Sequence, residues 1–424
     1  RLASGRQVEA TANHPFMTLD GWVSLGDLAV GDRLAVPRRV PEPVHTERMD
    51  ESEVIMLAHM IGDGSCVKRQ PVRYASIDEE NLAAVSVAAW HFGVTPIRDE
   101  YAVARVTTLR LPAPYRLTHG KRNPIAAWLD KLGLFGKRSY EKFVPKEVFA
   151  LPNDQVALFL RHLWATDGSV RWDAKVGIGR IYYATTSRQL ADDVVQLLLR
   201  VGVLGRIARV KKAGYRDCWH VYVDRADNQI AFVTKIGVHG ARGDKAREVF
   251  LELKKRTGRP GSDTLPPAVW DVVRSKMAAK GWTNRDLKLA TNVVACEDRW
   301  KTSPGRDKVH RIAAALDDRE LHDLATNDVF WDEIVEITSI GKHDVYDGTV
   351  TGTHNFVANC ITMHNSLEQD ADMVMLLHRP DSIDRDDPRG GEADIILGKH
   401  RNGPTANITV AHQLHFSRFT NMAR

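Results

Sequence analysis

Short alternations of apolar and polar residues, interrupted by Asp-Gly and Gly-Asp pairs, run through residues 1–45 and predict β-strands, the first at Arg1–Ala10. Apolar positions recur with helical spacing from residue 50, and this helix should end at Gly62-Asp63-Gly64, where glycine can adopt the left-handed C-cap conformation. A mixed pattern continues to about residue 250. It predicts helices at Asn81–Phe92, Pro124–Leu132 and Arg188–Val201, and strands at Tyr101–Leu109, Ile181–Thr185 and Trp219–Val223.

A helix-rich pattern follows over residues 265–325, with predicted helices at Val269–Ala279, Asn284–Ala290 and Lys308–Leu316. Thr283 is the expected N-cap of the second of these, so the first two helices form either a DNA-reading helix-turn-helix or part of a plain three-helix bundle. Strands are predicted again at Glu333–Ser339, Val345–Val350 and Phe356–Met363. The remaining residues predict strands at Met373–Leu377, Ala393–Lys399 and Ile408–Leu414.

The composition narrows the class of protein. A chain of 424 residues with 43% hydrophobic and 27% charged residues predicts two to four globular domains. It has no signal-peptide pattern and no apolar run of the roughly 18–20 residues that a membrane span needs. Its 4 cysteines are far apart in the sequence, which argues against a disulfide framework and favours a reducing compartment such as the cytoplasm. Because the first residue is Arg1, we expect the reading frame to extend upstream.

Positive charge is concentrated in one part of the chain. Residues 201–260 contain 14 Lys and Arg against 6 Asp and Glu, whereas residues 366–424 contain 7 against 9. A basic tract of this size suits a phosphate backbone, although a solvated protein surface would explain it as well. Double-stranded DNA is therefore an expected partner.

A helical segment that ends in Asp-Gly-Ser occurs twice, 104 residues apart, at Met56–Gly64 and Leu160–Gly168. The small residues Ala58 and Gly62 would let two such helices pack closely and bring Asp63 and Asp167 to one end of their seam. Paired carboxylates of this kind can hold a divalent metal that hydrolyses a phosphodiester. An ordinary capped helix end would explain either copy of the motif taken alone.

This duplication resembles the two LAGLIDADG motifs of a monomeric homing endonuclease, whose fold is an α+β pseudo-dimer that straddles DNA. The resemblance implies that Asp63 and Asp167 bind Mg²⁺ and that Lys142, in a Lys-x-x-Pro string, assists catalysis. Two positions depart from the family pattern. His162 and Thr166 are bulkier than the residues the second motif prefers, so we expect them to separate the two helices.

A second chemistry is encoded in His364-Asn365-Ser366. The Asn365 side-chain amide can attack its own backbone carbonyl, which forms a succinimide and breaks the bond to Ser366, while the His364 imidazole acts as acid or base. Near the other end of the chain, Thr11 and His14 could polarise another scissile bond.

These strings resemble the splicing blocks of inteins, to which Asp347 and His354 also belong. The resemblance implies an all-β Hint domain split by the endonuclease. It implies that the Hint halves span residues 1–48 and 329–365 and that the endonuclease spans residues 49–260. A helical insert at 261–328 contains the candidate helix-turn-helix. An intein opens with a nucleophilic Cys or Ser, and nothing near Arg1 fits that role, so we expect it upstream.

Residues 366–424 resemble the end of the bacterial replicative hexameric DNA helicase, in the strings Ser-Leu-Glu-Gln-Asp-Ala-Asp and Lys-His-Arg-Asn-Gly-Pro-Thr. The resemblance implies a C-terminal α/β RecA-like fragment of a homohexamer. Lys399 and Arg401 would reach the γ-phosphate of ATP, which binds with Mg²⁺ on the adjacent subunit, and Gln369 would lie near the nucleotide. The resemblance also implies a cytoplasmic, nucleoid-associated location in a bacterium. The chain contains no Walker A string, so ATP hydrolysis would need the upstream part of the helicase.

The sequence therefore predicts a multidomain chain, an intein with an embedded endonuclease inside a replicative helicase. One alternative is a sequence-specific DNA-binding protein that does not cut and carries an autoprocessing Hint domain. A third possibility is an autoprocessing Hint domain without any DNA activity.

Overall fold

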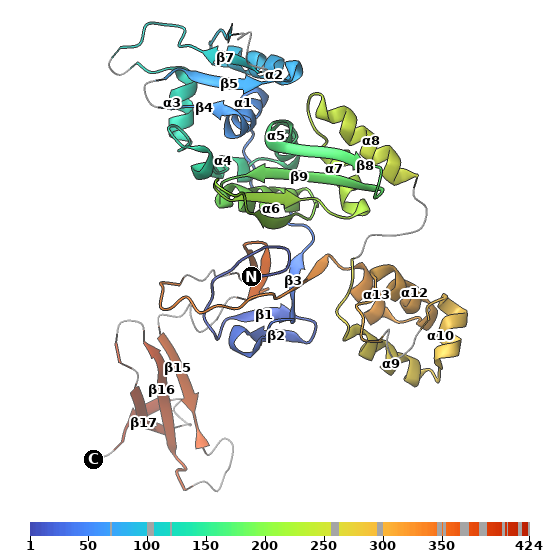
Figure 1. Ribbon diagram of the computed structural model, residues 1–424. Coiled ribbons are helices and arrows are strands. Elements are labelled where there is room, and N and C mark those ends of the chain that lie inside the picture. The colour runs from blue at the N-terminus through green and yellow to red at the C-terminus, as the bar shows by residue number, and fades with distance from the viewer. Residues whose placement is uncertain are drawn as a thin grey trace.

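The computed structural model describes residues 1–424 apart from thirteen short stretches. The stretches left out are 68–69, 100–105, 119–120, 256–262, 295–299, 346–349, 351–352, 365–372, 381–387, 401–402, 405, 414–417 and 423–424. Figure 1 shows a small β unit in the middle, a larger α/β unit above it, a helical bundle to one side and a separate sheet at the C-terminus. Among the described helices none is long and apolar enough to span a membrane.

The β unit in the middle is built from both ends of the chain, and we call it the terminal β unit. It has two sheets, with strand orders β13-β14-β1-β2 and β12-β3. The strands are β1 (Pro15–Thr18), β2 (Gly21–Ser24), β3 (Arg33–Pro37), β12 (Val329–Glu333), β13 (Asn355–Ala358) and β14 (Ile361–His364). Phe16 of β1 pairs with Met363 of β14, and Pro37 of β3 pairs with Val329 of β12. Everything between residues 37 and 329 therefore leaves and re-enters this unit at two adjacent strand ends.

The terminal β unit differs from the sequence expectation at both of its ends. Arg1–Ala10 is not a strand, because its backbone bonds in two directions: Ala3 N donates to Glu333 O at 2.8 Å, while Ser4 O accepts from Ile207 N of the α/β unit at 2.7 Å. The strand predicted at Glu333–Ser339 lies earlier, at β12, and residues 346–349 of the next prediction lie outside the described residues. The single strand predicted at Phe356–Met363 is a tight hairpin that turns at Asn359 and Cys360, both of which have positive φ.

The α/β unit, residues 51–254, contains the same arrangement twice, and we call it the duplicated unit. Each half runs helix, two strands, helix, two strands, helix. The first half is α1 (Glu51–Gly62), β4 (Gly64–Ser65), β5 (Val72–Ser76), α2 (Glu79–His91), β6 (Ile97–Asp99), β7 (Thr107–Leu111) and α3 (Pro124–Lys131). The second is α5 (Asn153–Asp167), β8 (Gly168–Asp173), β9 (Ile178–Thr185), α6 (Arg188–Arg200), β10 (Arg206–Val210), β11 (Cys218–Tyr222) and α7 (Ala226–Lys235). The two sheets have equivalent strand orders, β4-β5-β7-β6 and β8-β9-β11-β10.

Both halves of the duplicated unit share one hydrophobic core. The helices α1 and α5 pack against each other at its centre, and Leu57, Phe159 and Trp164 are all fully buried there. Short helices η2 (Ser139–Glu141) and α4 (Lys146–Phe149) connect the halves, and α8 (Arg242–Lys254) follows α7 and packs on β8. The predicted helices of this region are confirmed to within two residues at either end, and the strand predicted at Tyr101–Leu109 is β7 in the described part.

Residues 263–327 form a helical bundle whose hydrophobic core also includes Ala35 of β3 and Trp331 of β12. Its described helices are α9 (Val269–Ala279), α10 (Asn284–Thr291), α12 (Arg306–Leu316) and α13 (Arg319–Thr326). The side chain of Thr283 caps α10 as predicted, and α13 was not predicted. The buried Arg306 anchors the bundle, since it donates to Leu324 O at 2.9 Å and lies 3.1 Å from the Asp263 carboxylate.

The C-terminal part is an antiparallel sheet with strand order β15-β16-β17-β18. Its strands are β15 (Met373–His378), β16 (Glu392–His400), β17 (Ala406–Gln413) and β18 (Arg418–Asn421). The three predicted strands are confirmed, and β18 is additional. The described residues of this part contain no α-helix, so the α component of the expected α/β fragment is not seen in them.

Candidate active site

The two repeated motifs place their aspartates in equivalent positions. Asp63 is the C-cap of α1 and Asp167 is the last residue of α5, and each is followed by a glycine that begins a strand. Gly64 is not left-handed, contrary to expectation, and Gly168 is not left-handed either. They are required because a Cβ on Gly64 would lie 2.5 Å from Met60 Cα, and one on Gly168 would lie 2.2 Å from Trp164 O. The chain can therefore turn from helix to strand only without a side chain at this position.

The seam between α1 and α5 is closed, which corrects the expectation that bulky residues would separate the helices. Gly62 faces Thr166 so closely that a Cβ on Gly62 would lie 2.0 Å from Thr166 Oγ1. His162 fits because it has a partner in the other helix: its Nδ1 lies 3.0 Å from Nε2 of His59. The other ring nitrogen of His59 bonds the Tyr74 hydroxyl at 2.9 Å. The two imidazoles thus satisfy each other in the core instead of clashing.

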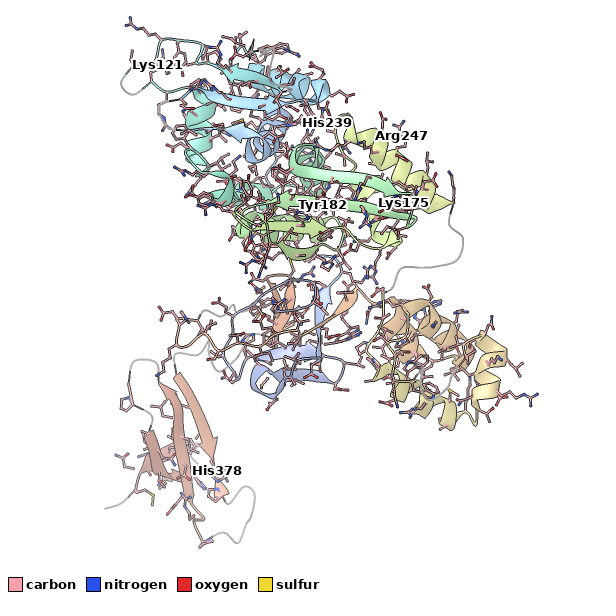
Figure 2. All side chains as sticks on the ribbon, viewed as in Figure 1. Lys121, Lys175, Tyr182, His239, Arg247 and His378 are labelled. Atoms are coloured by element: carbon pink, nitrogen blue, oxygen red, sulfur yellow. The ribbon has the colours of Figure 1, made fainter. Side chains whose placement is uncertain are left out.

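A third histidine covers this pair from the surface side. The ring of His239, labelled in Figure 2, lies over that of His162 with 4.3 Å between centroids. Burial lowers the pKa of His59 well below its usual value and lowers that of His162 to about 3. The buried pair is therefore neutral at neutral pH and adds no charge beside the aspartates.

The two aspartates are exposed residues at the edge of the buried core, and their carboxylates are close enough to influence each other. Burial, and then the neighbouring charge of Asp167, raises the pKa of Asp63 to about 6. Burial also raises the pKa of Asp167. Among the described residues no group of three or more His, Cys, Asp or Glu side chains forms a metal cluster. Two partly desolvated carboxylates side by side nevertheless suit a divalent cation, which would offset their mutual repulsion and supply Lewis-acid chemistry.

Lys142 lies beside the aspartates and has a defined structural task. Its Nζ donates to three carbonyl oxygens at the end of α1, those of Met60, Gly62 and Gly64, each at 3.0 Å. Burial lowers the pKa of this ammonium group, while Asp167 and Asp63 oppose that shift. Lys142 therefore fixes the helix end that carries Asp63.

Arg242 is a second cation at this site that the sequence reasoning missed. It begins α8, its Nη1 donates to Ala165 O near the end of α5, and its charge lowers the pKa of both aspartates. It follows Asp167 by 75 residues, much as Lys142 follows Asp63 by 79. This similar spacing was the signal in the sequence that could have identified Arg242. Each motif helix is thus held at its end by one basic side chain.

The duplication extends to a pair of buried tyrosines, which were also missed. Gly64 pairs with Tyr74 across β4 and β5, and Gly168 pairs with Tyr183 across β8 and β9. Both tyrosine side chains are fully buried. Burial, with a contribution from the aspartate charges, raises the pKa of both hydroxyls above the usual range. No sequence pattern pointed to them because strand register selects them.

A second group of predicted residues lies in the terminal β unit. Thr11 and His14 form a turn before β1, in which His14 N donates to Thr11 O at 3.0 Å. Both line a cavity of about 1020 Å³ together with Asn359 and Cys360 of the β13–β14 turn. The structure thus brings residues from the two ends of the chain to one cavity.

His354 and His364 lie on the hairpin that forms the other side of this unit. Their rings are stacked with 6.4 Å between centroids, and the His364 ring also contacts Trp22 at 4.9 Å. Neither residue lines the cavity of Thr11 and His14. The remaining predicted residues lie outside the described residues or have no described side chain: Asp347, Asn365, Ser366, Gln369, Lys399 and Arg401.

Comparison with known proteins finds two domain families that match parts of the chain. Residues 154–237 match a LAGLIDADG-like domain, and residues 361–421 match a DnaB-like helicase C terminal domain. The replicative DNA helicase DnaB of Synechocystis sp. (strain ATCC 27184 / PCC 6803 / Kazusa) is 38% identical over 434 residues, which cover 99% of this chain. The chain is thus homologous to DnaB helicases and contains a LAGLIDADG-like domain. It spans 49% of that relative's length.

Two further similarities concern parts of the chain. The DnaB helicase of Mycobacterium leprae (strain TN) is 83% identical over 59 residues, 14% of this chain and 10% of that protein. Mesophilic variants of the homing endonuclease I-DmoI match 44% of this chain and 94% of their own, with 14% identity and a TM-score of 0.32.

The tight seam leads to a prediction about helix packing. Gly62→Ala should destabilise the duplicated unit by about 1–3 kcal/mol, because the new methyl group overlaps Thr166. Adding Thr166→Gly should recover most of that loss, which a double-mutant cycle of urea unfolding would measure. Equal losses from Gly62→Ala with and without Thr166→Gly would contradict direct contact at this point.

The coupled aspartates lead to a prediction about pH. The folded-state pKa of Asp63, about 6, exceeds the ordinary value of 3.8, so its stabilising contribution is complete below pH 3.8 and is lost as the pH rises through 6. With a chelator present, Asp63→Asn should therefore raise Tm at pH 7.5 and leave it nearly unchanged at pH 4. Asp154→Asn, which removes an exposed carboxylate from the other end of α5, is the control and should not show this pH-dependent gain. A Tm gain for Asp63→Asn that is the same at both pH values would refute the coupling.

Proposed function

We propose that this chain is an intein with an embedded homing endonuclease, set into a DnaB-type helicase. The observation that carries the proposal is the pairing of Pro37 with Val329. Both ends of the chain close the terminal β unit, and about 290 residues leave it and return to it at one point. An insertion within a splicing domain requires this arrangement. The high identity to a helicase over only 59 residues supports a separate origin for the C-terminal segment.

In the proposed splicing unit, Asn365 performs the cleavage step. Its side-chain nitrogen attacks its own carbonyl carbon, the bond to the Ser366 nitrogen breaks, and the leaving amine takes a proton while a succinimide remains. His364 would supply or remove that proton, with Asp347 and His354 assisting, and the Ser366 hydroxyl would serve as acyl acceptor. Thr11 and His14 would polarise the upstream junction from the cavity wall, which their shared turn supports.

In the proposed endonuclease, Asp63 and Asp167 would hold Mg²⁺, which would supply Lewis-acid chemistry for phosphodiester hydrolysis. Their raised pKa values support this role, because a bound cation would offset both the desolvation of the carboxylates and their mutual repulsion. Lys142 and Arg242 would fix the two helix ends and offset phosphate charge.

The proposed host function is that of a replicative helicase. Lys399 and Arg401 would contact ATP with its Mg²⁺ across a homohexamer interface, and Gln369 would lie near the nucleotide. The DnaB-like match over residues 361–421 supports this assignment. We infer a cytoplasmic location from the same relatives.

One observation favours a second candidate function, a DNA-binding protein that does not cut. All three N–H groups of Lys142 are bonded to backbone carbonyls, which suits a structural lysine as well as a catalytic one. Cleavage and binding must therefore be measured separately.

Nuclease activity is tested with a DNA duplex that spans the uninterrupted helicase gene. With Mg²⁺ the chain should cut it, and Asp167→Asn should slow cutting roughly 100-fold or more, because one of two metal-binding carboxylates is lost. Asp154→Asn, on the opposite end of the same helix, should cut like the parent. Binding without any cutting by the parent would favour the non-cutting alternative.

Splicing chemistry is tested by release of the C-terminal segment. The purified chain should release residues 366–424 on incubation and leave a product whose mass is one water below that of the free acid. Asn365→Ala should abolish release because it removes the nucleophilic amide, whereas Asn407→Ala in β17 should not affect it. Mass spectrometry distinguishes these products, and release from the Asn365→Ala protein would show that the junction lies elsewhere.

A further inference from the structure

The helix α10 is unusually exposed for part of a folded bundle. Only Leu287 and Thr291 are buried, one turn apart on a single narrow stripe. That stripe packs toward α12, and Arg311 of α12 donates to Thr291 O at 3.2 Å, which holds the C-terminal end of α10. The helix is therefore firmly attached along one edge and leaves the rest of its surface to solvent.

The outward side of α10 is mainly basic. Helical spacing puts Arg285, Lys288, Leu289 and Asn292 on the side away from the buried stripe. All four are exposed, and 77% of the Leu289 side chain is accessible. The only acid of the helix, Asp286, is bonded to its own cap residue, Thr283, at 2.7 Å. The outward side thus presents cations, an amide and an apolar group, and its one carboxylate, that of the exposed Asp286, is engaged by Thr283.

These cations differ from most exposed arginines of the molecule. Across the described residues, exposed arginines are commonly paired with carboxylates, as in Arg98–Glu79, Arg122–Asp130 and Arg206–Asp224. Arg285 and Lys288 make no such ion pair within the described part of the chain, and neither does the neighbouring Lys308 of α12. Their charge therefore remains available to a partner.

The bundle is polarised, which restricts the class of partner. Its opposite side, around α13, carries Asp317, Asp318, Glu320 and Asp323. Lys276 is engaged there, at 3.1 Å from Asp318 and 2.8 Å from Glu320. A polyanion would be attracted to the α10 side and repelled from the α13 side.

The path from α9 into α10 has the form of a helix-turn-helix. The helix α9 ends at Ala279 with Lys280 as its C-cap, and Gly281 takes a φ of +68° that bends the chain. Thr283 and Asp286 then form the capping box that starts α10. The backbone N–H of Trp282 donates to Met277 O at 2.9 Å and fixes the turn. The second helix of such a motif enters the major groove, where Arg, Lys and Asn side chains reach base edges and apolar groups contact thymine methyls.

We propose that α10 is the reading helix of a second DNA-binding surface, which docks in the major groove of a duplex through Arg285, Lys288, Leu289 and Asn292. In Figure 1 the bundle lies beside the terminal β unit, away from α1 and α5, whose ends carry Asp63 and Asp167. The surface would therefore contact a part of the duplex other than the cleavage point. The choice of DNA rests on the proposed endonuclease function.

The test measures DNA affinity with the full chain, in which Asp63→Asn and Asp167→Asn prevent cutting. The probe is the duplex that spans the uninterrupted helicase gene, and anisotropy is recorded at several salt concentrations. Arg285→Ala with Lys288→Ala should weaken binding at least 10-fold and shorten the footprint at one end. Leu289→Lys leaves the charge attraction but removes the apolar contact, so it should reduce discrimination against unrelated DNA.

The matched control removes two positive charges from the acidic side of the same bundle, through Lys276→Ala with Arg319→Ala. It should bind like the parent, and unchanged hydrogen exchange in α12 would show that both double variants keep the bundle folded. Equal affinities and footprints for the two double variants would overturn the proposed surface while leaving the endonuclease proposal intact. Failure of the parent to bind any duplex would overturn both.

Discussion

The contact between α1 and α5 is the constraint on which the candidate nuclease site depends. At Gly62 and Thr166 the two helices are too close to admit one additional methyl group. One turn earlier, the rings of His59 and His162 fill the seam, and each is the hydrogen-bond partner of the other. Because the helices cannot slide or part without breaking one of these contacts, the ends that carry Asp63 and Asp167 are held together.

That arrangement has an electrostatic cost, and the surroundings reduce it in several ways. Two carboxylates are kept partly desolvated side by side, so the pKa of each rises. Lys142 and Arg242 approach from equivalent positions in the two halves and oppose those shifts, while the histidines beneath remain neutral. The cations are themselves anchored to helix-end carbonyls, which favours them there through the helix dipole. The two cations balance the two carboxylates in formal charge, yet the pKa values of both aspartates stay raised, so a divalent cation would stabilise the carboxylates further.

The sequence predicted those features that depend on local pattern. The duplicated helix, the Thr283 cap and most helix boundaries of the duplicated unit follow from periodicity and capping residues. The errors arose where a residue was considered without its partner. His162 looked obstructive because its hydrogen bond to His59 comes from a segment 103 residues away. Tyr183 was invisible because strand register, a tertiary feature, brings it to the aspartates, and Arg242 was missed because the packing of α8 decides which basic residue of that tract does so.

The error at Arg1–Ala10 shows how the two main units are joined. This segment alternates like a strand, yet Ser4 O accepts from Ile207 N of β10 and Gly5 O accepts from Arg188 of α6 at 2.9 Å. Gly5 is suited to this junction because its φ is +82° and a Cβ would lie 2.1 Å from Ile207 O. The same segment carries Arg6, buried beside Asp332 of β12 at 3.8 Å. One short stretch therefore bonds to the second half of the duplicated unit and to the closing strand of the terminal β unit. Since a loop whose ends meet at adjacent strands can be long at little extra entropic cost, topology alone would leave the duplicated unit loosely tethered. These contacts oppose that freedom and tie it to the unit that its insertion interrupts.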